Sequence, residues 1–299
     1  MSDAAMTNSR QPLEGRVAFI TGANRGLGLE IARAFITAGA SLMLCARDSE
    51  QLDRAGNELR ASLHADQTVQ WRAANVTDPI EIEVLVKECI QTLGGLHILV
   101  NNAGVYGPFG NIEEVDWAEW VKAIEINLLG SVIPIRAVLP HFKAQRSGKI
   151  LQLSGGGATN PLPRISAYAA SKAAIVRFAE TIALECRDFG IDVNSLAPGA
   201  LNTRLLDDIL AAGPDLVGAD FFEHATRQKA EGGVPLARGA ELAVFLASAA
   251  SDGITGKIVS AVWDNWTAWP EHVEELTRSD AYSLRRITGR DRGLAWGDK

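Results

Sequence analysis

The chain has few of the features that mark secreted, metal-binding or nucleic-acid-binding proteins. Its 299 residues include three cysteines, which form no CxxC pair and no even-numbered disulfide framework. The net charge of −7 provides no basic excess for nucleic acid, and the five histidines form no spaced metal pair. These shortages predict a cytoplasmic protein with free thiols, no metal site and no nucleic-acid partner.

Long hydrophobic runs are also missing. The polar start, residues 1–11, has no apolar stretch like that of a secretory signal, and no other apolar run has the length of a bilayer span. We therefore expect no membrane partner. A hydrophobic fraction of 47% with 22% charged residues is typical of a soluble domain of this length.

Short apolar segments alternate with longer segments that have apolar residues at helical spacing. Strands that are apolar throughout, each followed by a helix, predict a doubly wound α/β fold with a parallel sheet covered on both faces. We expect a flexible N-terminus (1–13), one α/β domain (14–262) and a C-terminal extension (263–299). The expected strands are 17–20, 41–45, 69–73, 96–100, 149–153, 191–196 and 257–261, and the expected helices are 27–38, 49–63, 80–92, 117–139, 166–187 and 240–248.

Two segments depart from this alternation. Over residues 204–235 the periodicity loosens, which favours a flexible loop. The C-terminal extension contains Trp263, Trp266, Trp269 and Trp296. Rings this large are expected to pack on their own domain or a partner subunit, or else to form a wall of a substrate pocket.

A glycine-rich turn joins the first strand to the first helix. Glycine there permits a tight turn and lets the backbone approach a pyrophosphate, whose charge is met by the helix N-terminus. Ordinary βα turns also need glycine, but the position between a buried strand and a helix favours dinucleotide binding. The turn consists of Thr21, Gly22, Ala23, Asn24, Arg25, Gly26, Leu27 and Gly28.

The end of the second strand favours NADP(H) as the cofactor. In such folds an acidic residue there favours NAD, whereas an arginine accommodates the 2′-phosphate of NADP. Arg47 lies just past the strand and Arg25 lies in the glycine turn, so two guanidinium groups could meet one phosphate. Arg47 could instead be a solvated loop residue. Asp48, one position late for a ribose ligand, keeps NAD(H) as the alternative.

Tyr168 and Lys172 lie four residues apart near the start of an expected helix, and so share one of its faces. A phenol with a pKa near 10 is a poor acid–base catalyst at neutral pH, and a neighbouring ammonium group lowers that pKa. Such a tyrosine can exchange a proton with a carbonyl oxygen that receives a hydride. In isolation the pair would more often be a surface contact; the glycine turn and the order of strands favour chemistry.

Taken together, these residues resemble the short-chain dehydrogenase/reductase superfamily in its compact single-domain form. The resemblance covers about Glu14 to Ala261 and implies a Rossmann-like sheet of seven parallel strands with a Tyr–Lys–Asn–Ser tetrad. It also implies a homodimer or homotetramer formed through the long helices. The segments that carry it are residues 21–28, Asn101, Asn102, Ala103, Gly104, Asn127, Tyr168, Lys172, Pro198, Gly199 and Thr203.

The resemblance assigns a role to each of these residues. Tyr168 is the acid–base residue, and Lys172 holds the nicotinamide ribose and lowers the pKa of Tyr168. Asn127 holds a water in the proton relay, and Thr203 contacts the nicotinamide amide. Other cofactor contacts fall on Asn102, Ala103, Gly104, Pro198 and Gly199, and on Asn75 and Val76, which stand where the family binds adenine, usually with Asp in place of Asn.

The sequence departs from the family at the serine of the tetrad. Counting back from Tyr168, the family serine falls on Gly155, while Ser154 comes one position early. Either Ser154 or Thr159 serves in a reshaped loop, or the tetrad is incomplete. A missing hydroxyl donor costs on the order of 10²-fold in rate by analogy with an oxyanion hole.

The leading function is therefore an NADP(H)-dependent oxidoreductase that acts on a carbonyl or secondary alcohol of a small molecule. Residues 204–235 would form a lid over that substrate. Gly155 motivates an alternative, a cofactor-binding sensor or partner protein with weakened chemistry. A sugar-like or cyclic polyol substrate is a third hypothesis.

Overall fold

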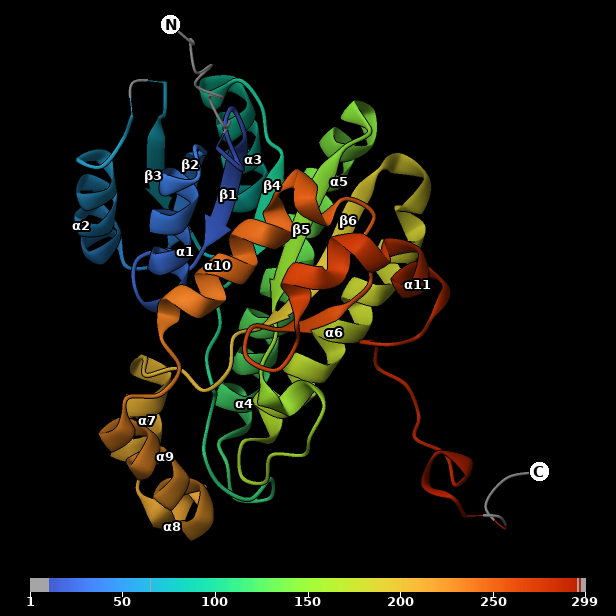
Figure 1. The fold of residues 1–299 in the computed structure, drawn as a ribbon. Coiled ribbons are helices and arrows are strands. Elements are labelled where there is room, and N and C mark those ends of the chain that lie inside the picture. The colour runs from blue at the N-terminus through green and yellow to red at the C-terminus, as the bar shows by residue number, and fades with distance from the viewer. Residues whose placement is uncertain (1–10, 65, 295, 297–299) are drawn as a thin grey trace, which may run out of the picture.

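A computed structural model describes residues 11–64, 66–294 and 296, and its sheet has seven parallel strands in the order β3-β2-β1-β4-β5-β6-β7 (Figure 1). This confirms the expected doubly wound α/β fold, and each predicted strand is found within two residues of its expected bounds. The strands are β1 (Val17–Thr21), β2 (Ser41–Ala46), β3 (Val69–Ala73), β4 (Ile98–Asn101), β5 (Gly148–Leu153), β6 (Ile191–Ala197) and β7 (Ile258–Ser260).

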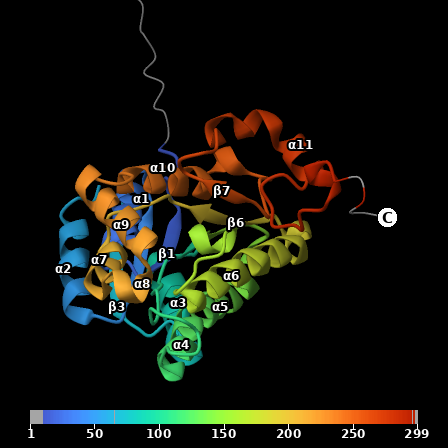
Figure 2. The same cartoon turned by 90° about the horizontal axis from the view of Figure 1, so that it is seen from below.

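Helices cover both faces of the sheet (Figure 2). One face carries α1 (Gly26–Thr37), α2 (Ser49–Arg60) and α10 (Leu236–Ala247), and the other carries α3 (Pro79–Leu93), α5 (Gly130–Gln145) and α6 (Ser166–Glu185). Successive residues of a strand point to opposite faces, so each strand supplies both hydrophobic layers.

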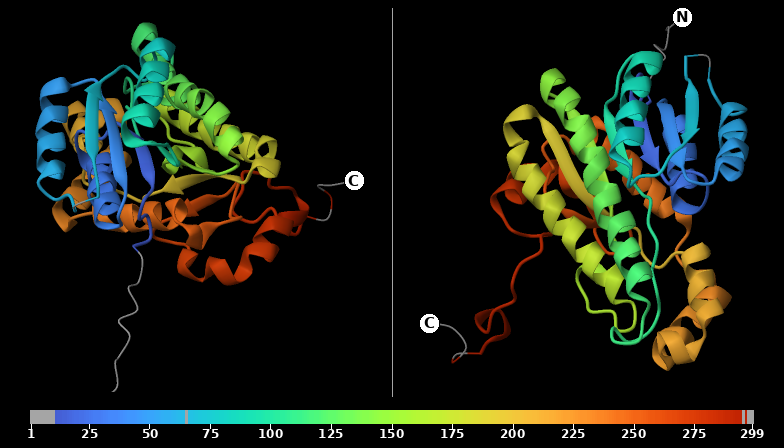
Figure 3. Two further views of the ribbon diagram at one scale, coloured as in Figure 1. Left: turned by 90° about the horizontal axis from the view of Figure 1, so that it is seen from above. Right: turned by 180° about the vertical axis from the view of Figure 1, so that it is seen from behind.

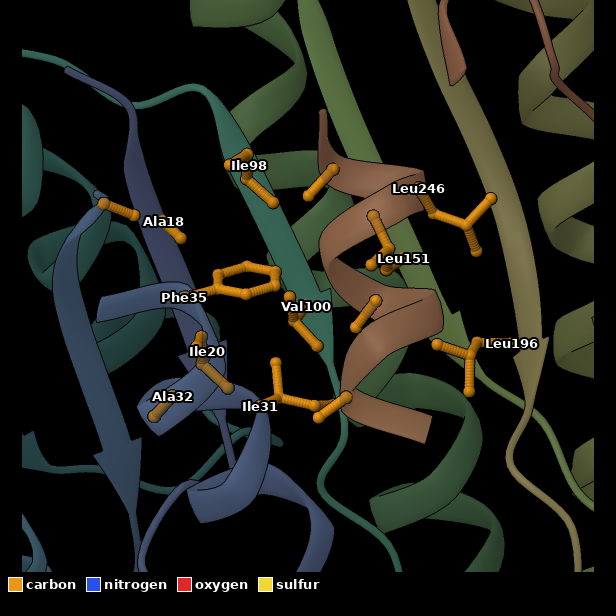
Figure 4. Packing of buried hydrophobic residues seen from close by; sticks show 14 of the residues in the cluster. Ala18, Ile20, Ile31, Ala32, Phe35, Ile98, Val100, Leu151, Leu196 and Leu246 are labelled. Atoms are coloured by element: carbon orange, nitrogen blue, oxygen red, sulfur yellow. The ribbon is translucent and has the colours of Figure 1, made fainter. Parts of the chain in front are cut away.

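The two layers are continuous hydrophobic clusters. On the first face Phe35 and Ile31 of α1 pack with Leu246 of α10 over Val100 and Leu151 (Figure 4). On the second face α3, α5 and α6 pack over alternate residues of the same strands; this cluster includes Phe19, Leu99, Val138, Phe142, Ile150 and Ile182. Strands buried on both sides explain the uninterrupted apolar segments of the sequence.

The strand order reverses beside β1, which pairs with β2 on one side and with β4 on the other. The connections from these strands run to opposite faces of the sheet, and such a switch point opens a crevice at the carboxyl ends of the strands. The glycine turn after β1 and the Asn101–Gly104 segment after β4 therefore meet at this crevice.

One helical stretch has the length and composition of a membrane span, contrary to the expectation from the sequence. Residues Trp117–Gln145 comprise α4 (Trp117–Ile124), a π-helical turn (Glu125–Leu129) and α5. Of its most hydrophobic window 44% is buried inside the protein, and α5 packs on α3 and β4. The apolar character of this stretch is therefore accounted for by its place in the core.

The segment expected to be a flexible loop is helical. It folds as α7 (Arg204–Ala212), α8 (Pro214–Val217) and α9 (Ala219–Glu231), beyond the carboxyl ends of the strands (Figure 1). Gly213 and Gly218 adopt positive φ angles and separate the three helices. Because these glycines interrupt the helical spacing of apolar residues, the sequence pattern did not predict the helices. The three helices share a small buried cluster of Leu206, Ile209, Val217 and Ala225.

The structure describes part of each end of the chain. The predicted flexible N-terminus lies outside the described residues as far as residue 10, whereas Leu13 is fully buried in the core. Trp266 and Trp269 are buried against the α10 side, while Trp263 and Trp296 are 86% and 85% exposed. After α11 (Val273–Arg278) the chain passes β7, where the Ile258 amide donates to the Tyr282 carbonyl. The Leu284 amide then donates to Glu180 of α6, and beyond this contact the chain leaves the body (Figure 3).

Candidate active site

The glycine turn is held against the loop that follows β4. Gly22 has φ 64°, and a Cβ added there would lie 2.9 Å from the Cα of Ala103. A Cβ on Gly28 would lie 2.4 Å from Nδ2 of Asn102. These approaches admit only glycine at both positions, so the glycines are what allow the turn to pack directly against the loop after β4.

Asn102 and Thr21 lock the two loops together. Nδ2 of Asn102 donates to the Thr21 carbonyl at 3.0 Å and the Gly22 carbonyl at 2.9 Å, and Oγ1 of Thr21 accepts from the Asn102 amide at 3.0 Å. Oγ1 of Thr21 also accepts from the Ala103 amide at 3.2 Å. The Asn101–Gly104 segment is therefore more than a simple turn, because its hydrogen bonds fix the shape of the glycine turn.

Positive charge gathers at the end of β2. Arg25 and Arg47 are both exposed. Partial burial lowers the pKa of Arg25, and the nearby cations Arg204 and Arg47 lower it further. Asp48, which could have held a ribose, instead caps α2, where its Oδ1 accepts from the Gln51 amide at 2.9 Å. This corner therefore holds two guanidinium groups near the carboxylates of Asp48 and Asp208, and Asp48 also caps α2.

The other predicted contacts of the adenosine half fall beside this corner. Nδ2 of Asn24 donates to Gln51 of α2 at 3.1 Å. Asn75 is exposed, and its Oδ1 accepts from the Thr77 backbone amide at 3.2 Å. The side-chain oxygen of Asn75 thus closes the same turn that an aspartate oxygen could close. Val76 is buried against Gly130. Leu27, also predicted as a cofactor contact, is buried in the core beneath the turn.

Tyr168 and Lys172 lie in the first turns of α6, as their spacing predicts. They are 8% and 6% exposed, and the Lys172 ammonium lies 5.5 Å from the centre of the Tyr168 ring. Nζ of Lys172 donates to the carbonyl of Leu153 at 2.8 Å, and a Cβ on Gly104 would lie 3.8 Å from it. The pair therefore faces the ends of β4 and β5.

The expected direction of the Tyr168 pKa is wrong for the protein without cofactor. Burial raises the pKa of Tyr168, and Tyr106 adds to the increase. Burial also lowers the pKa of Lys172 to about 8. Burial is the main cause of both pKa shifts, and the ammonium of Lys172 is directed at the Leu153 carbonyl rather than at the phenol oxygen.

Asn127 lies in the π-helical turn between α4 and α5. Its side chain is fully engaged: Oδ1 accepts from the Val105 amide, and Nδ2 donates to the Val105 carbonyl and to Oγ of Ser171. Its carbonyl accepts from Ser131, which also accepts from Gln152 at 3.0 Å. Single π-helical turns occur often at functional sites, and this one brings Asn127 under Gly104.

Gly155 approaches Tyr168 so closely that a side chain there would collide with it. A Cβ on Gly155 would lie 2.3 Å from the Tyr168 hydroxyl oxygen. Ser154 is buried and its Oγ has no hydrogen-bond partner, while Thr159 is exposed and accepts from Asn160. The structure thus brings Gly155 to the phenol and leaves Thr159 at the surface.

The last predicted cofactor residues follow β6. Pro198 contacts the α10 side at Gly239, and Gly199 has φ 88°. Thr203 begins α7 and lies next to the glycine turn, 3.7 Å from a Cβ added to Gly26. The end of β6 and the beginning of the lid helices therefore meet the glycine turn.

The sequence did not single out Tyr106 or Ser171. The Tyr106 ring packs edge-on against Tyr168, with centroids 4.6 Å apart, and Ser171 orients Asn127. Tyr106 follows the Asn101–Gly104 segment by two residues, so closeness to a recognised motif was the only available signal.

A separate cavity of about 820 Å³ lies at the amino-terminal ends of the strands, opposite to the end that carries the glycine turn. It is lined by residues at the beginning of β4, β5 and β6 and by the C-terminal extension, so it is remote from Tyr168. Among the described residues, no group of three or more His, Cys, Asp and Glu side chains could hold a metal ion.

These residues fit a dinucleotide. The glycine turn presents backbone that no Cβ covers, cationic groups stand at the end of β2, and a buried ammonium stands at the end of β5. Thr203, at the start of α7, lies next to Gly26 of the glycine turn.

The comparisons with known proteins agree with this site. The family model described as short chain dehydrogenase matches residues 16–212. The chain is 33% identical to an L-fucose dehydrogenase of Oryctolagus cuniculus over 238 residues, 79% of this chain and 80% of that protein. It is 33% identical over 244 residues to a 3-alpha-(or 20-beta)-hydroxysteroid dehydrogenase of Mycobacterium tuberculosis, 82% of this chain and 86% of that protein.

A solved structure shows the same fold. The crystal structure of a gluconate 5-dehydrogenase from Burkholderia cenocepacia, in complex with NADP and tartrate, superposes with a TM-score of 0.73 at 28% identity. The match covers 84% of this chain and 95% of that one. Sequence, sheet order and site geometry lead to one conclusion: the chain belongs to the short-chain dehydrogenase/reductase family and is an NAD(P)-dependent oxidoreductase acting on CH–OH groups.

Proposed function

We propose that this chain is a cytoplasmic, NADP(H)-dependent oxidoreductase that interconverts a carbonyl and a secondary alcohol on a small molecule, with Tyr168 as its acid–base residue. The observation that carries this proposal is the convergence of Tyr168, Lys172 and Asn127 with the glycine turn at one edge of the sheet. A bound nicotinamide would supply or accept the hydride.

The protein's own residues would handle the proton. In reduction the carbonyl carbon gains the hydride, and its oxygen takes the proton of the Tyr168 hydroxyl; oxidation reverses both transfers. Lys172 would hold the nicotinamide ribose and stabilise the phenolate that forms on Tyr168. Asn127 would carry a relay water on its backbone, because its side-chain amide is already engaged.

The preference for NADP(H) rests on Arg25 and Arg47. Two guanidinium groups at the end of β2 favour a 2′-phosphate through charge-assisted hydrogen bonds, and the capping role of Asp48 removes the main competitor for a ribose hydroxyl. NADP in the gluconate 5-dehydrogenase structure supports the same choice.

Titration of the purified protein with NADPH and NADH tests the cofactor, followed by a carbonyl panel with an absorbance readout. We expect tighter binding of NADPH, and about a tenfold loss of that preference in Arg47→Ala. Tyr168→Phe should still bind NADPH and lose turnover by about 10³-fold. Full activity in Tyr168→Phe would contradict the mechanism.

Gly155 favours a second candidate function, a cofactor-binding sensor with weakened chemistry. The hydroxyl that the family places at this position is absent, and the nearest serine, Ser154, has a buried hydroxyl without a partner. This candidate predicts tight NADPH binding with no turnover across the carbonyl panel; appreciable reduction would exclude it.

We further propose that the chain forms a homodimer or homotetramer through α5 and α6. An apolar groove of about 310 Å³ lies between these helices and includes Leu139, Phe178 and Ile182. Leu184 of α6 is also exposed. Light scattering on the purified protein tests this, with Leu184→Glu, at a side chain that is 64% exposed, expected to shift the mass towards the monomer.

A further inference from the structure

The loop after β4 extends the catalytic tyrosine into a row of three aromatic rings. The ring of Tyr106 lies edge-on to Tyr168, with centroids 4.6 Å apart and planes at 62°. The ring of Phe109 lies 5.8 Å from that of Tyr106. We call Tyr168, Tyr106 and Phe109 the aromatic row; it leads from the phenol oxygen towards the lid helices.

The lid helices rest on this row with apolar side chains. Leu206, Ile209 and Val217 form the buried centre of the lid, and Tyr106 and Phe109 pack against that cluster. Partly buried Leu210, Phe221 and Phe222 join the same contact. Burial raises the pKa of Tyr106 to about 12, with a smaller effect from Asp208, which fits a hydroxyl in apolar surroundings.

Several polar groups of the lid are occupied by one another. Lys229 of α9 pairs with Asp207 of α7 at 2.7 Å, and Gln228 donates to Asn202 at 3.1 Å. Arg164 donates to the Asp215 carbonyl at 2.5 Å and so ties the lid to the loop before α6. These groups serve the lid's own structure rather than a hydroxylated ligand.

We infer that Tyr106 is a specificity-determining residue, and that the substrate is a ketone or secondary alcohol carrying a bulky apolar group that lies between the aromatic row and the lid. This inference rests on the proposed function, because it takes the Tyr168 hydroxyl as the reacting end. A substrate that separates row and lid exposes apolar surface, and only an apolar group buries it again. A polyol would place its hydroxyl groups against a lining that is mainly apolar, where the Tyr106 hydroxyl and Asp208 could pair with only a few of them.

The test compares two ketones on the enzyme with saturating NADPH: acetophenone, an aryl alkyl ketone, and fructose, a polyhydroxylated ketone. We expect kcat/KM for acetophenone to exceed that for fructose by at least about tenfold. Tyr106→Ala should reduce kcat/KM for acetophenone by roughly tenfold and shrink the ratio, whereas Tyr106→Phe, which keeps the ring, should preserve the ratio. Trp296→Ala, at an exposed ring far along the chain, is the matched control.

Calorimetry supplies a readout that needs no turnover. Tyr168→Phe loaded with NADP⁺ should bind 1-phenylethanol and not sorbitol, and adding Tyr106→Ala should weaken that binding. Tighter binding of sorbitol than of 1-phenylethanol, or faster reduction of fructose than of acetophenone, would overturn the inference about the substrate. The assignment as an oxidoreductase would remain. Binding of 1-phenylethanol in a protein that reduces no ketone would support the inference and count against the proposed function.

Discussion

The floor of the active site and its lid are built in opposite ways. The floor is made from strand ends held by hydrogen bonds, such as those of Asn102 to the glycine turn and of Asn127 to Val105. The lid, α7 to α9, is held by its own small apolar cluster and by polar pairs within itself. A floor of fixed geometry suits a cofactor shared by many relatives, and a lid with a separate core can change its lining without disturbing that floor.

The largest effect is expected for the floor's buried ammonium. Lys172→Met should lower kcat/KM by at least about 10²-fold, because the phenolate of Tyr168 loses its stabilising charge. The same variant should be more stable at pH 7 by up to about 3 kcal/mol, since burial lowers the Lys172 pKa from its usual 10.5 to about 8. Urea unfolding of the cofactor-free protein measures this change. An unaltered or lower stability would show that the ammonium is better solvated than its burial implies.

Gly155→Ala tests whether the floor tolerates any side chain beside the phenol. The added Cβ would lie 2.3 Å from the Tyr168 hydroxyl oxygen, so the phenol must move and kcat/KM should fall by roughly 10². Gly156→Ala is the matched control, because a Cβ there has no neighbour within 4 Å. Higher activity in Gly155→Ser would contradict this prediction. It would show that the site can accommodate the family serine and gains from its hydroxyl group.

The pH dependence of reduction should be set by the titration of Lys172 in the floor rather than by groups of the lid. With a Lys172 pKa of about 8, the protonated form that supports proton donation by Tyr168 is lost as the pH rises. We therefore expect kcat/KM for reduction to fall by about tenfold per pH unit well above pH 8. For stability the sign is opposite: the unfolded chain binds more protons than the native one between about pH 8 and 10.5, so this group's contribution rises across that window.

The smallest effect is expected at the lid's attachment. Arg164 adopts φ 66°, an uncommon value for a residue other than glycine, and donates to the Asp215 carbonyl. Arg164→Gly relieves the backbone and removes the bond, so we expect a KM increase of about threefold with little change in NADPH affinity. Parallel measurement of KM and NADPH binding separates the lid from the floor; equal losses in both would mean that the two regions are not independent.

Much of this architecture was predictable because local signals and tertiary structure agree. The central strands, such as β1, β4 and β5, were found because they are buried on both faces, and α6 because Tyr168 and Lys172 lie on a long helical pattern. The lid helices were missed because Gly213 and Gly218 interrupt their periodicity, and α8 has only four residues. The partners of Trp266 and Trp269 could not be predicted either, since their contacts with the α10 side depend on how the chain returns after β7.

The sequence by itself predicted the parallel sheet and the glycine turn, because apolar strands that alternate with helical segments and a glycine-rich βα turn can be recognised from residue types along the chain. It also nominated Tyr168 and Lys172 as an acid–base pair, through their spacing and the family resemblance. Only the tertiary structure decided what surrounds that pair. It brought Gly155 against the phenol, assigned Asp48 to a helix cap and set Tyr106 between Tyr168 and the lid. It also gave the direction in which burial shifts the pKa of Tyr168 and of Lys172, because a pKa depends on burial and neighbouring groups, which spacing along the chain does not define.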